Sequence, residues 1–379
     1  MPSLLDPRRK VAIYVLAAFA AGALITAGVI NLGADRQMAR SPGVASTPSA
    51  ATSAATSGAT TGTAPGSTVV APGGKAGAAT GAPSPADATT PPSDGAETGD
   101  AQAVDIDSSD WPDDAPTPEQ VFTAQPERLK AAVAKLAHRT PGKTNVYAVA
   151  FAGDGSENVF RNEAEYLDQL MTTRFGAPGH TLVLENNPGT LTTRPLASWT
   201  NLEDGLTALR KVMDPTQDVL LLYVATHGGD DHSLLVDMDP LPLDQLDPDG
   251  LVGIFKKHAF RWKVVVVNAC YSGGFVPKLQ GEGTLVMTSA RTDRTSFGCG
   301  TDSDMTYFGR AWLADGLNAT PDFVEAFGKA KAEVAAWEAK ESLEASEPQI
   351  DIGAGIADKL GDWRKGLKPG PVVPFTAAK

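Results

Sequence analysis

Five short runs of aliphatic and β-branched residues constrain the fold of this chain more than any other feature. The runs are Val146–Phe151, Thr181–Leu184, Val219–Val224, Val264–Val267 and Leu285–Thr288. Continuous Val and Leu runs, without strict polar alternation, are typical of strands buried on both faces of a parallel sheet. Stretches with helical periodicity separate several of them, at 159–174, 200–213 and 249–258. Strands that alternate with helices predict a three-layer α/β domain with a mostly parallel central sheet.

The part of the chain before these runs has a different composition. From Arg40 to about Ala103 it consists mostly of Ala, Gly, Pro, Ser and Thr, with almost no large apolar side chains. Such a segment cannot bury enough surface to offset the entropy lost on ordering. We therefore predict a disordered linker over 34–114, which ends in the acidic patch Asp105–Asp114.

The folded domain is expected over 115–350. Its first helix should begin at Thr117-Pro118-Glu119-Gln120, where a capping Thr, a proline at the first helical position and a capping-box Gln follow one another. A long amphipathic helix is expected over Asp322–Leu343. The Gly- and Pro-rich remainder, 351–379, is expected to be irregular and to lie on the surface.

The N-terminus predicts a membrane anchor. The basic residues of 1–10 precede an uncharged stretch from Val11 to Gly33, which is long enough to cross a bilayer. The cationic flank should stay in the cytoplasm, so the remainder would lie in the periplasm or outside the cell, as expected for a bacterial inner-membrane protein. We predict an uncleaved signal anchor over 11–33. The alternative is a signal peptide cleaved near Ala34, although Leu32 fits the cleavage pattern poorly.

Composition and motifs exclude several classes of function. The net charge is −13 and the only run of basic residues is at the extreme N-terminus, so a nucleic-acid partner is not expected. Gly142-Lys143-Thr144 precedes a predicted strand, whereas a phosphate-binding loop follows one. Asp244–Gly250 lacks the spacing of a calcium-binding loop. Neither G-x-S-x-G nor H-E-x-x-H occurs, and we expect no metal or cofactor.

Two of the predicted strands end in reactive side chains. His227 and Gly228 follow the third run, and Cys270 follows the fourth. Because the carboxyl ends of parallel strands meet at one edge of a sheet, the imidazole and the thiol should lie side by side. Such a pair can catalyse acyl transfer, in which the thiol attacks a carbonyl and the imidazole moves the proton. The amides of Gly228 and Cys270 are the candidates for an oxyanion hole.

Each of these residues has an ordinary structural alternative. A single cysteine after a buried strand is usually a small core residue, and a single histidine there is usually part of a turn. Their joint placement favours the catalytic interpretation. A helix that begins just past Cys270 would help to hold a thiolate. Cys299, the only other cysteine, has two alternatives: a buried small residue, or half of a disulfide that would block Cys270.

The same motifs resemble the legumain, or asparaginyl endopeptidase, family of cysteine peptidases. The hydrophobic runs into His227-Gly228 and into Ala269-Cys270 are its most specific parts. Phe160–Glu165 resembles the Tyr-Arg-His-Gln-Ala-Asp segment of that family, and Thr295–Cys299 resembles its Ser-Ser-Tyr-Ala-Cys segment. The resemblance covers about 146–313. It implies a caspase-like fold with Cys270 as nucleophile, His227 as acid/base and a free Cys299.

The resemblance also implies a pocket for the side chain at P1, the substrate residue before the scissile bond. Arg161 would line it, Thr295 and Ser296 would form its wall, and Asp304 would lie at its base. A guanidinium can hydrogen-bond an amide or a carboxylate, so a P1 Asn or acidic residue is expected. The alternative for Arg161 is a surface salt bridge.

This sequence departs from the family pattern at three places. Asn162 replaces the histidine after the pocket arginine, Val159 replaces an asparagine, and Tyr271 replaces the acidic residue after the nucleophile. These changes leave the Cys–His chemistry in place and leave the P1 preference open.

We therefore predict a membrane-anchored cysteine endopeptidase that acts on peptide or protein substrates through an acyl-enzyme. No third residue that would orient His227 is evident in the sequence. A transpeptidase with the same pair of residues is one alternative. A catalytically inactive periplasmic binding or scaffold domain, with Cys270 oxidised or buried, is the other.

Overall fold

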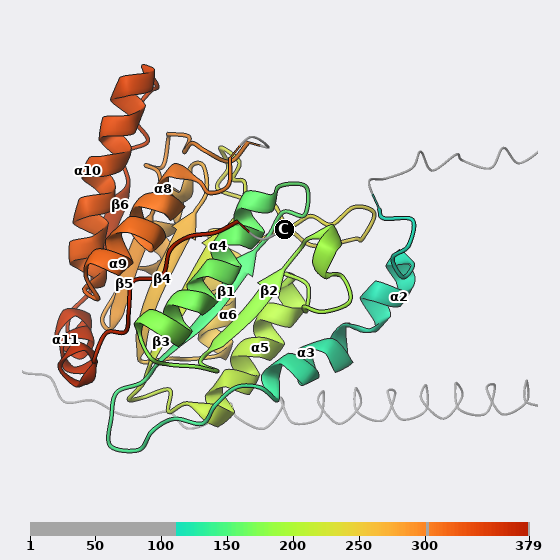
Figure 1. Ribbon diagram of the computed structural model, residues 1–379, viewed down its shortest axis with the longest axis horizontal. Helices are drawn as coiled ribbons and strands as arrows, with labels where there is room; N and C mark the ends of the chain where they lie inside the picture. The colour runs from blue at the N-terminus through green and yellow to red at the C-terminus, as the bar shows by residue number, and fades with distance from the viewer. Residues whose placement is uncertain (1–110, 301–302, 378–379) are drawn as a thin grey trace, which may run out of the picture. The chain divides into compact units, whose positions relative to one another are not determined.

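The computed structural model describes residues 111–300 and 303–377 (Figure 1). These residues belong to the compact unit Glu97–Lys379. The predicted signal anchor at 11–33 and all but the last residues of the predicted linker lie outside the described residues. Among the helices that the structure does describe, none is both long and apolar enough to cross a bilayer.

The centre of the domain is a six-stranded sheet with the strand order β2-β1-β3-β4-β5-β6. The first five strands run parallel, and β6 is antiparallel to β5. The strands are β1 (Val146–Ala152), β2 (Thr181–Glu185), β3 (Val219–Ala225), β4 (Trp262–Asn268), β5 (Thr284–Thr288) and β6 (Gln349–Ile352). All five runs identified in the sequence are therefore strands, and the prediction of a mostly parallel α/β sheet is confirmed.

Helices cover both faces of this sheet (Figure 1). One face packs against α4 (Asn158–Gln169), its π-helical continuation η1 (Leu170–Arg174), α8 (Tyr307–Gly309), η4 (Arg310–Gly316), α9 (Leu317–Ala319), α10 (Phe323–Glu341) and α11 (Ile356–Gly366). The other face packs against α3 (Gln125–Val133), α5 (Trp199–Val212), α6 (Pro248–Lys257) and α7 (Val276–Leu279). The three-layer architecture is consistent with a caspase-like fold.

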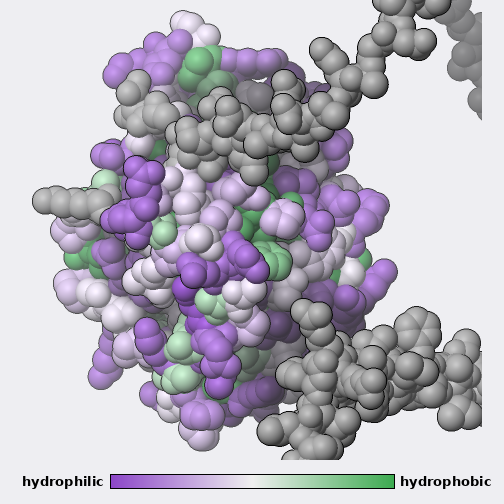
Figure 2. All heavy atoms as spheres, turned by 90° about the vertical axis from the view of Figure 1, so that its right-hand side faces the viewer, coloured by the Kyte–Doolittle hydropathy of each residue, from purple (hydrophilic) through white to green (hydrophobic). Residues whose placement is uncertain are grey.

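The continuous apolar runs reflect this double covering. In β3, Leu221 and Tyr223 face the α4 layer, whereas Leu222 and Val224 face the α5 layer, and all four are fully buried. Successive side chains of a strand point to opposite faces, so a strand covered on both sides has no polar position. The surface on the side of α2 (Pro118–Thr123) and α3 is mostly hydrophilic, with scattered hydrophobic patches (Figure 2).

The predicted start of the first helix is also confirmed. The Gln120 amide donates to the Thr117 hydroxyl over 3.3 Å, and the Thr117 amide donates to the Gln120 side chain over 3.0 Å. This reciprocal pair is the capping box of α2.

The prediction for the end of the chain was wrong. Strand β6 and helix α11 lie where 351–379 was expected to be irregular. Ile356, Leu360 and Trp363, spaced as neighbours on one helical face, bury α11 against the core. Strand β6 has four residues and is only half buried, so it is too short for its pattern to be recognised. The domain therefore extends beyond 350.

A buried carboxylate joins the amino ends of β1 and β3. Asp218, just before β3, accepts hydrogen bonds from Arg139 Nε (2.7 Å), from the Asn145 amide and side chain (both 2.9 Å) and from the Asp214 amide (2.8 Å). Burial alone would raise the pKa of Asp218, but hydrogen bonds from Arg139 and Asn145 outweigh it and hold the pKa below its ordinary value.

We predict that Asp218→Asn lowers the free energy of unfolding by about 2–4 kcal/mol at pH 7. The Asn side chain has one acceptor oxygen and an NH₂ group, so it cannot accept all the hydrogen bonds that the carboxylate accepts. The stability from a carboxylate with a lowered pKa is lost as the pH falls through that pKa, so the difference from wild type should shrink below about pH 4. Urea unfolding at both pH values measures this. The exposed Asp249→Asn, which breaks only a surface pair with Lys278, should cost at most about 1 kcal/mol. Equal losses in the two variants would contradict the assignment.

Candidate active site

The structure brings the loops that carry His227 and Cys270 together at the carboxyl edge of the sheet. In the parallel pair of β3 and β4, Ala225 lies opposite Asn268, and each reactive residue is two positions farther along its strand. The loops touch directly, because a Cβ atom at Gly228 would lie 2.2 Å from the carbonyl oxygen of Cys270. Only glycine at 228 allows this approach, so the sequence His-Gly is required for the two chain segments to meet.

A tight turn presents Cys270. The next residue, Tyr271, has a φ of 55°, in the left-handed region. Its amide donates to the Arg294 carbonyl (2.7 Å), and its carbonyl contacts His232 Nδ1 (3.0 Å). The helix expected just past Cys270 is only the short 3₁₀ turn η3 (Ser272–Phe275) followed by the four-residue α7. The expected support of a thiolate by a helix dipole was therefore wrong, because too few peptide dipoles are aligned.

A neighbouring loop contacts the sulfur instead. The Ser296 amide donates to Cys270 Sγ over 3.3 Å, and the Ser296 carbonyl and hydroxyl oxygens lie 3.6 and 3.8 Å from it. These contacts fix the position of the sulfur beside the Ser296 loop. Ser296, predicted as pocket wall, thus lies at the sulfur, and Thr295 beside it is exposed.

Asp154 is a third polar residue at this edge, and sequence reasoning missed it. Its Oδ2 lies 3.4 Å from His227 Nε2, and the carboxylate is 1% exposed. The Ser156 amide and hydroxyl fix it with hydrogen bonds of 2.9 Å. The rule that identified His227 and Cys270 also applies here, because Asp154 comes directly after the carboxyl end of β1.

Other contacts hold the imidazole and its loop in place. Phe160 contacts the His227 ring edge-to-face, with centroids 5.1 Å apart. The His227 carbonyl accepts from the Leu235 amide (3.0 Å), which fixes the loop. The amides of Gly228 and Cys270, predicted as an oxyanion hole, have no hydrogen-bond partner within the described part of the chain. They are therefore available to an oxyanion.

The two cysteines are free thiols in this structure, not a disulfide. Burial raises the pKa of Cys299 to about 11, and the nearby charge of Cys270 adds to the effect. Cys299 is thus a protonated, poorly nucleophilic thiol at neutral pH.

A buried carboxylate lies underneath the Cys270 turn. Glu163 accepts hydrogen bonds from the Tyr223 hydroxyl (2.7 Å), the Asn268 side chain (2.8 Å) and both the amide (2.9 Å) and hydroxyl (2.7 Å) of Thr306. Burial raises the pKa of Glu163, and these hydrogen bonds oppose the rise. This cluster joins α4 to β3, to the end of β4 and to the N-cap of α8, so it fixes the frame from which Cys270 projects.

Arg161 lies on α4, half-buried, next to a buried carboxylate at the end of β2. Glu185 is 1% exposed and its oxygens have no hydrogen-bond partner among the described residues. Burial raises the pKa of Glu185 to about 7, the charge of Glu165 adds to this, and those of Arg194 and Arg161 oppose it. Arg194 forms a fork with Glu165 (2.8 and 2.7 Å). Arg161 forms no ion pair within the described ranges, so the surface salt bridge considered for it is not seen there.

Asp304 lies at the surface, in the segment just before the N-cap of α8. Its side chain is exposed and lines a hollow with Tyr307 and Arg310, in whose wall His227, Cys270 and Ser296 do not take part. Its backbone carbonyl accepts from the Asn162 side chain (2.9 Å).

A thiol and an imidazole at the ends of adjacent parallel strands are an arrangement that thiol-dependent hydrolases use. Residues 200–358 match the model of the Peptidase C13 family and form a domain of that family, the legumain family of cysteine peptidases. The matched range contains His227, Cys270 and Ser296, whereas Asp154 and Arg161 precede it. No curated protein matches the chain.

We predict that Glu185→Gln stabilises the protein at alkaline pH. An acid whose pKa is raised in the fold makes the protein less stable as the pH rises from about 4.5 to about 7, because the unfolded chain loses the proton first. The variant should gain up to about 3 kcal/mol over wild type at pH 8 and little at pH 4. Urea unfolding at both pH values measures the gain. The exposed Glu282→Gln should show no such difference, and a gain of Glu185→Gln that is the same at both pH values would contradict the prediction.

Proposed function

We propose that this protein is a cysteine endopeptidase in which Cys270 is the nucleophile and His227 the acid/base. The observation that carries the proposal is the convergence, inside a Peptidase C13 domain, of a sulfur that accepts a backbone N–H with an imidazole backed by a buried carboxylate. Thiol, imidazole and orienting carboxylate come from three adjacent strands, β4, β3 and β1.

The reaction proposed has two halves. The Cys270 thiolate attacks the peptide carbonyl, a C–S bond forms, and the oxyanion accepts hydrogen bonds from the amides of Gly228 and Cys270, worth about 3–4 kcal/mol per donor in comparable sites. The His227 imidazolium protonates the leaving amine as the C–N bond breaks, which leaves an acyl-enzyme. His227 then removes a proton from water, which attacks the thioester and releases the acid and the thiolate.

Asp154 would act as a positioning residue. Its contact with Nε2 leaves Nδ1 of His227 as the nitrogen that exchanges protons with the thiol and the leaving group. A buried carboxylate also stabilises the imidazolium form and fixes the ring orientation, as a third residue does in comparable hydrolases.

For the P1 residue we propose Asn in preference to Asp. Arg161 can hydrogen-bond either side chain, and the family resemblance assigns Thr295 and Ser296 to the same pocket. Glu157 lies near His227 and Asp154, and burial raises its pKa, although the charge of His227 opposes the rise. An ionised Glu157 would repel a P1 carboxylate, so the preference for Asn should weaken as the pH falls. The role of Asp304 at the pocket base depends on the family resemblance alone.

We also propose that residues 11–33 anchor the peptidase in a membrane with the domain on the outer side. The proposal depends on the uncharged stretch and its basic flank.

Cys270→Ala and His227→Ala should each lower hydrolysis of fluorogenic peptides by at least about a thousandfold. A peptide set that differs only at P1 measures both the loss and the preference for Asn over Asp. Equal release of fluorophore by wild type and Cys270→Ala would refute the mechanism.

Thiol labelling gives an independent control. Wild type should show one fast-alkylated cysteine, which disappears in Cys270→Ser and persists in Cys299→Ser, because Cys299 is held protonated. If Cys270 reacts no faster than Cys299, the alternative of an inactive scaffold gains support.

Asp154→Asn should lower kcat by about a hundredfold or more with a smaller change in KM, because the imidazolium loses its carboxylate partner. The pH profile of kcat/KM should change as well, which a mere packing defect would not cause. Asp230→Asn, the same chemical change at an exposed position three residues past His227, is the matched control. A normal kcat and an unchanged pH profile in Asp154→Asn would remove this residue from the mechanism.

A further inference from the structure

Strand β2 is an edge of the sheet, and part of its outer edge is unpaired. The Ala148 amide donates to the His180 carbonyl (2.8 Å) and the Asn186 amide donates to the Ala152 carbonyl (3.0 Å). In a parallel pair, alternate residues of a strand hydrogen-bond to the same neighbour. These two bonds show that the even-numbered residues of β2 bond to β1. The N–H and C=O groups of Thr181, Val183 and Glu185 therefore point to the outer side of β2.

Only the far end of that outer edge is closed. The Glu185 amide donates to the Pro195 carbonyl (3.0 Å). For Thr181 and Val183, no backbone hydrogen bond on the outer side occurs within the described residues. Unpaired groups of an edge strand are a template for one more strand, which supplies the missing donors and acceptors.

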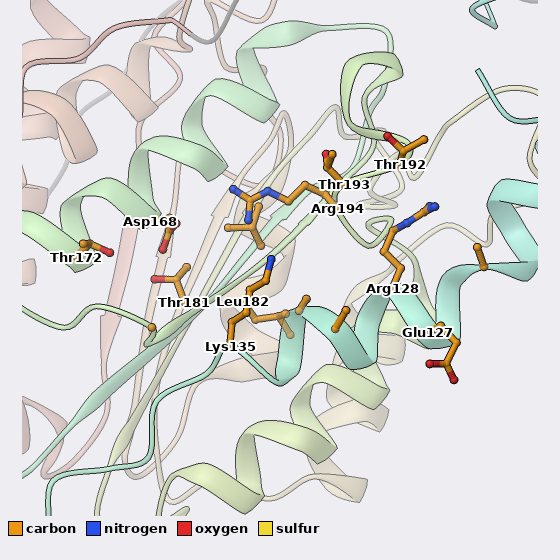
Figure 3. Close-up of a pocket in the computed structure, with 15 residues that line it drawn as sticks. Glu127, Arg128, Lys135, Asp168, Thr172, Thr181, Leu182, Thr192, Thr193 and Arg194 are labelled. Atoms are coloured by element: carbon orange, nitrogen blue, oxygen red, sulfur yellow. The ribbon is translucent and has the colours of Figure 1, made fainter. Parts of the chain in front are cut away.

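This open edge forms the floor of a groove between α3 and α4 (Figure 3). The cavity has a volume of 440 Å³, within the roughly 300–1,000 Å³ common for ligand sites. Thr181, Leu182 and Val183 line the floor, and Arg128 and Lys135 stand on the α3 side. The groove therefore offers an extended backbone both hydrogen-bonding groups and room.

The α3 wall is cationic. Arg128 and Lys135 have no ion pair among the residues that the structure describes, and Arg128 has a buried nitrogen without a hydrogen-bond partner. Glu127 also lines the groove, but it pairs with Lys130 over 3.0 Å, and in Figure 3 its side chain points away from Arg128 and Lys135. The chain as a whole has a net charge of −13, but this wall carries two cations without an ion-pair partner among the described residues. A ligand with negative charge is therefore favoured beside the open strand.

The α4 wall differs from the α3 wall. Asp168 and Thr172 line it, and Arg194 reaches across from the loop after β2 with its guanidinium already held by Glu165. Burial raises the pKa of Asp168. A carboxylate on this side would lie next to Asp168, so small neutral side chains fit here and acidic ones do not.

We propose that this groove binds an extended acidic segment of a partner protein, which adds to β2 as a further strand. Side chains alternate along a strand, so carboxylates at every second position would face Arg128 and Lys135, and the small neutral residues between them would face Asp168 and Thr172. The backbone groups of Thr181 and Val183 supply affinity, and the charge difference between the two walls supplies selectivity for an alternating sequence.

The carboxyl end of β2 lies at the same edge of the sheet as the candidate active site. Glu185 pairs with Ala152 at the carboxyl end of β2, on the sheet edge from which His227 projects. Two inter-strand steps separate β2 from β3, about 10 Å in all.

The test uses the full chain with Cys270→Ala, so that no peptide is cleaved. Fluorescence anisotropy measures binding of a fluorescein-labelled peptide, Thr-Asp-Val-Asp-Thr-Asp-Val, and of its counterpart with Lys in place of Asp. The acidic peptide should bind saturably and the basic one should not. Arg128→Glu and Lys135→Glu should each weaken binding about tenfold, whereas Lys130→Glu should not, because Lys130 lies on α3 and pairs with Glu127.

A further pair of variants separates strand addition from simple charge attraction. Thr181→Pro removes one outward N–H at the first residue of the strand, where proline is tolerated, and should weaken binding about tenfold without any change of charge. Thr181→Val keeps the N–H and should bind normally. Thermal unfolding of both variants checks that the fold is retained.

Three results would overturn the proposal. One is the absence of saturable binding to the acidic peptide, and another is an equal loss in Lys130→Glu and Arg128→Glu. The third is a more than tenfold gain in affinity on replacing Asp105 and Asp107 by Asn, which would assign the groove to the acidic stretch of this same chain. Because binding is measured without turnover, none of these results depends on whether the protein is a peptidase.

Discussion

The parallel pairing of β3 with β4 is the constraint on which the rest of the site depends. The register sets Ala225 opposite Asn268, and a shift of one residue would turn His227 and Cys270 to opposite faces of the sheet. That register is itself specified by burial. Side chains of both strands are covered by helices on both sides, so any slip would exchange the residues packed against α4 with those packed against α5.

Buried carboxylates reinforce this frame at both ends of the strands. Asp218 holds the amino ends of β1 and β3 together, and Glu163 joins the carboxyl ends of β3 and β4 to α4 and the N-cap of α8. Both carboxylates are satisfied by several donors, which offsets the cost of burying a charge. Burial raises the pKa of both Glu163 and Glu185, but Glu185 lacks such donors within the described chain, and its ion-pair partner Arg194 stands 4.0 Å away. The number of converging donors therefore decides how firmly a buried carboxylate joins the elements around it.

Features that depend on neighbouring residues in the sequence were predictable, whereas features that depend on residues far apart in the chain were not. Long, apolar strands and the reactive residues directly after them were predictable, because burial on two faces leaves a local pattern and the topology of parallel sheets places strand ends together. Asp154 was missed although it follows β1 in the same way, because its role appears only through its distance to His227. Strand β6 and the contact between Ser296 and Cys270 join distant parts of the chain, so no local pattern marks them. The helix expected after Cys270 was wrong because the close-packed glycines after Tyr271 produce a short turn instead.

The two edges of the sheet show why the groove on β2 calls for a ligand of particular chemistry. At the other edge, β6 is antiparallel and short, which limits its use as a template for pairing. The outer side of β2 is closed at Glu185 but leaves Thr181 and Val183 unpaired, and the cations of α3 stand over that opening. Charged side chains commonly protect an exposed strand from self-association, since a second identical edge would bring like charges together. Here the protecting charges on the α3 side, Arg128 and Lys135, are both positive. The same two residues would therefore repel a second copy of this chain and attract an acidic strand.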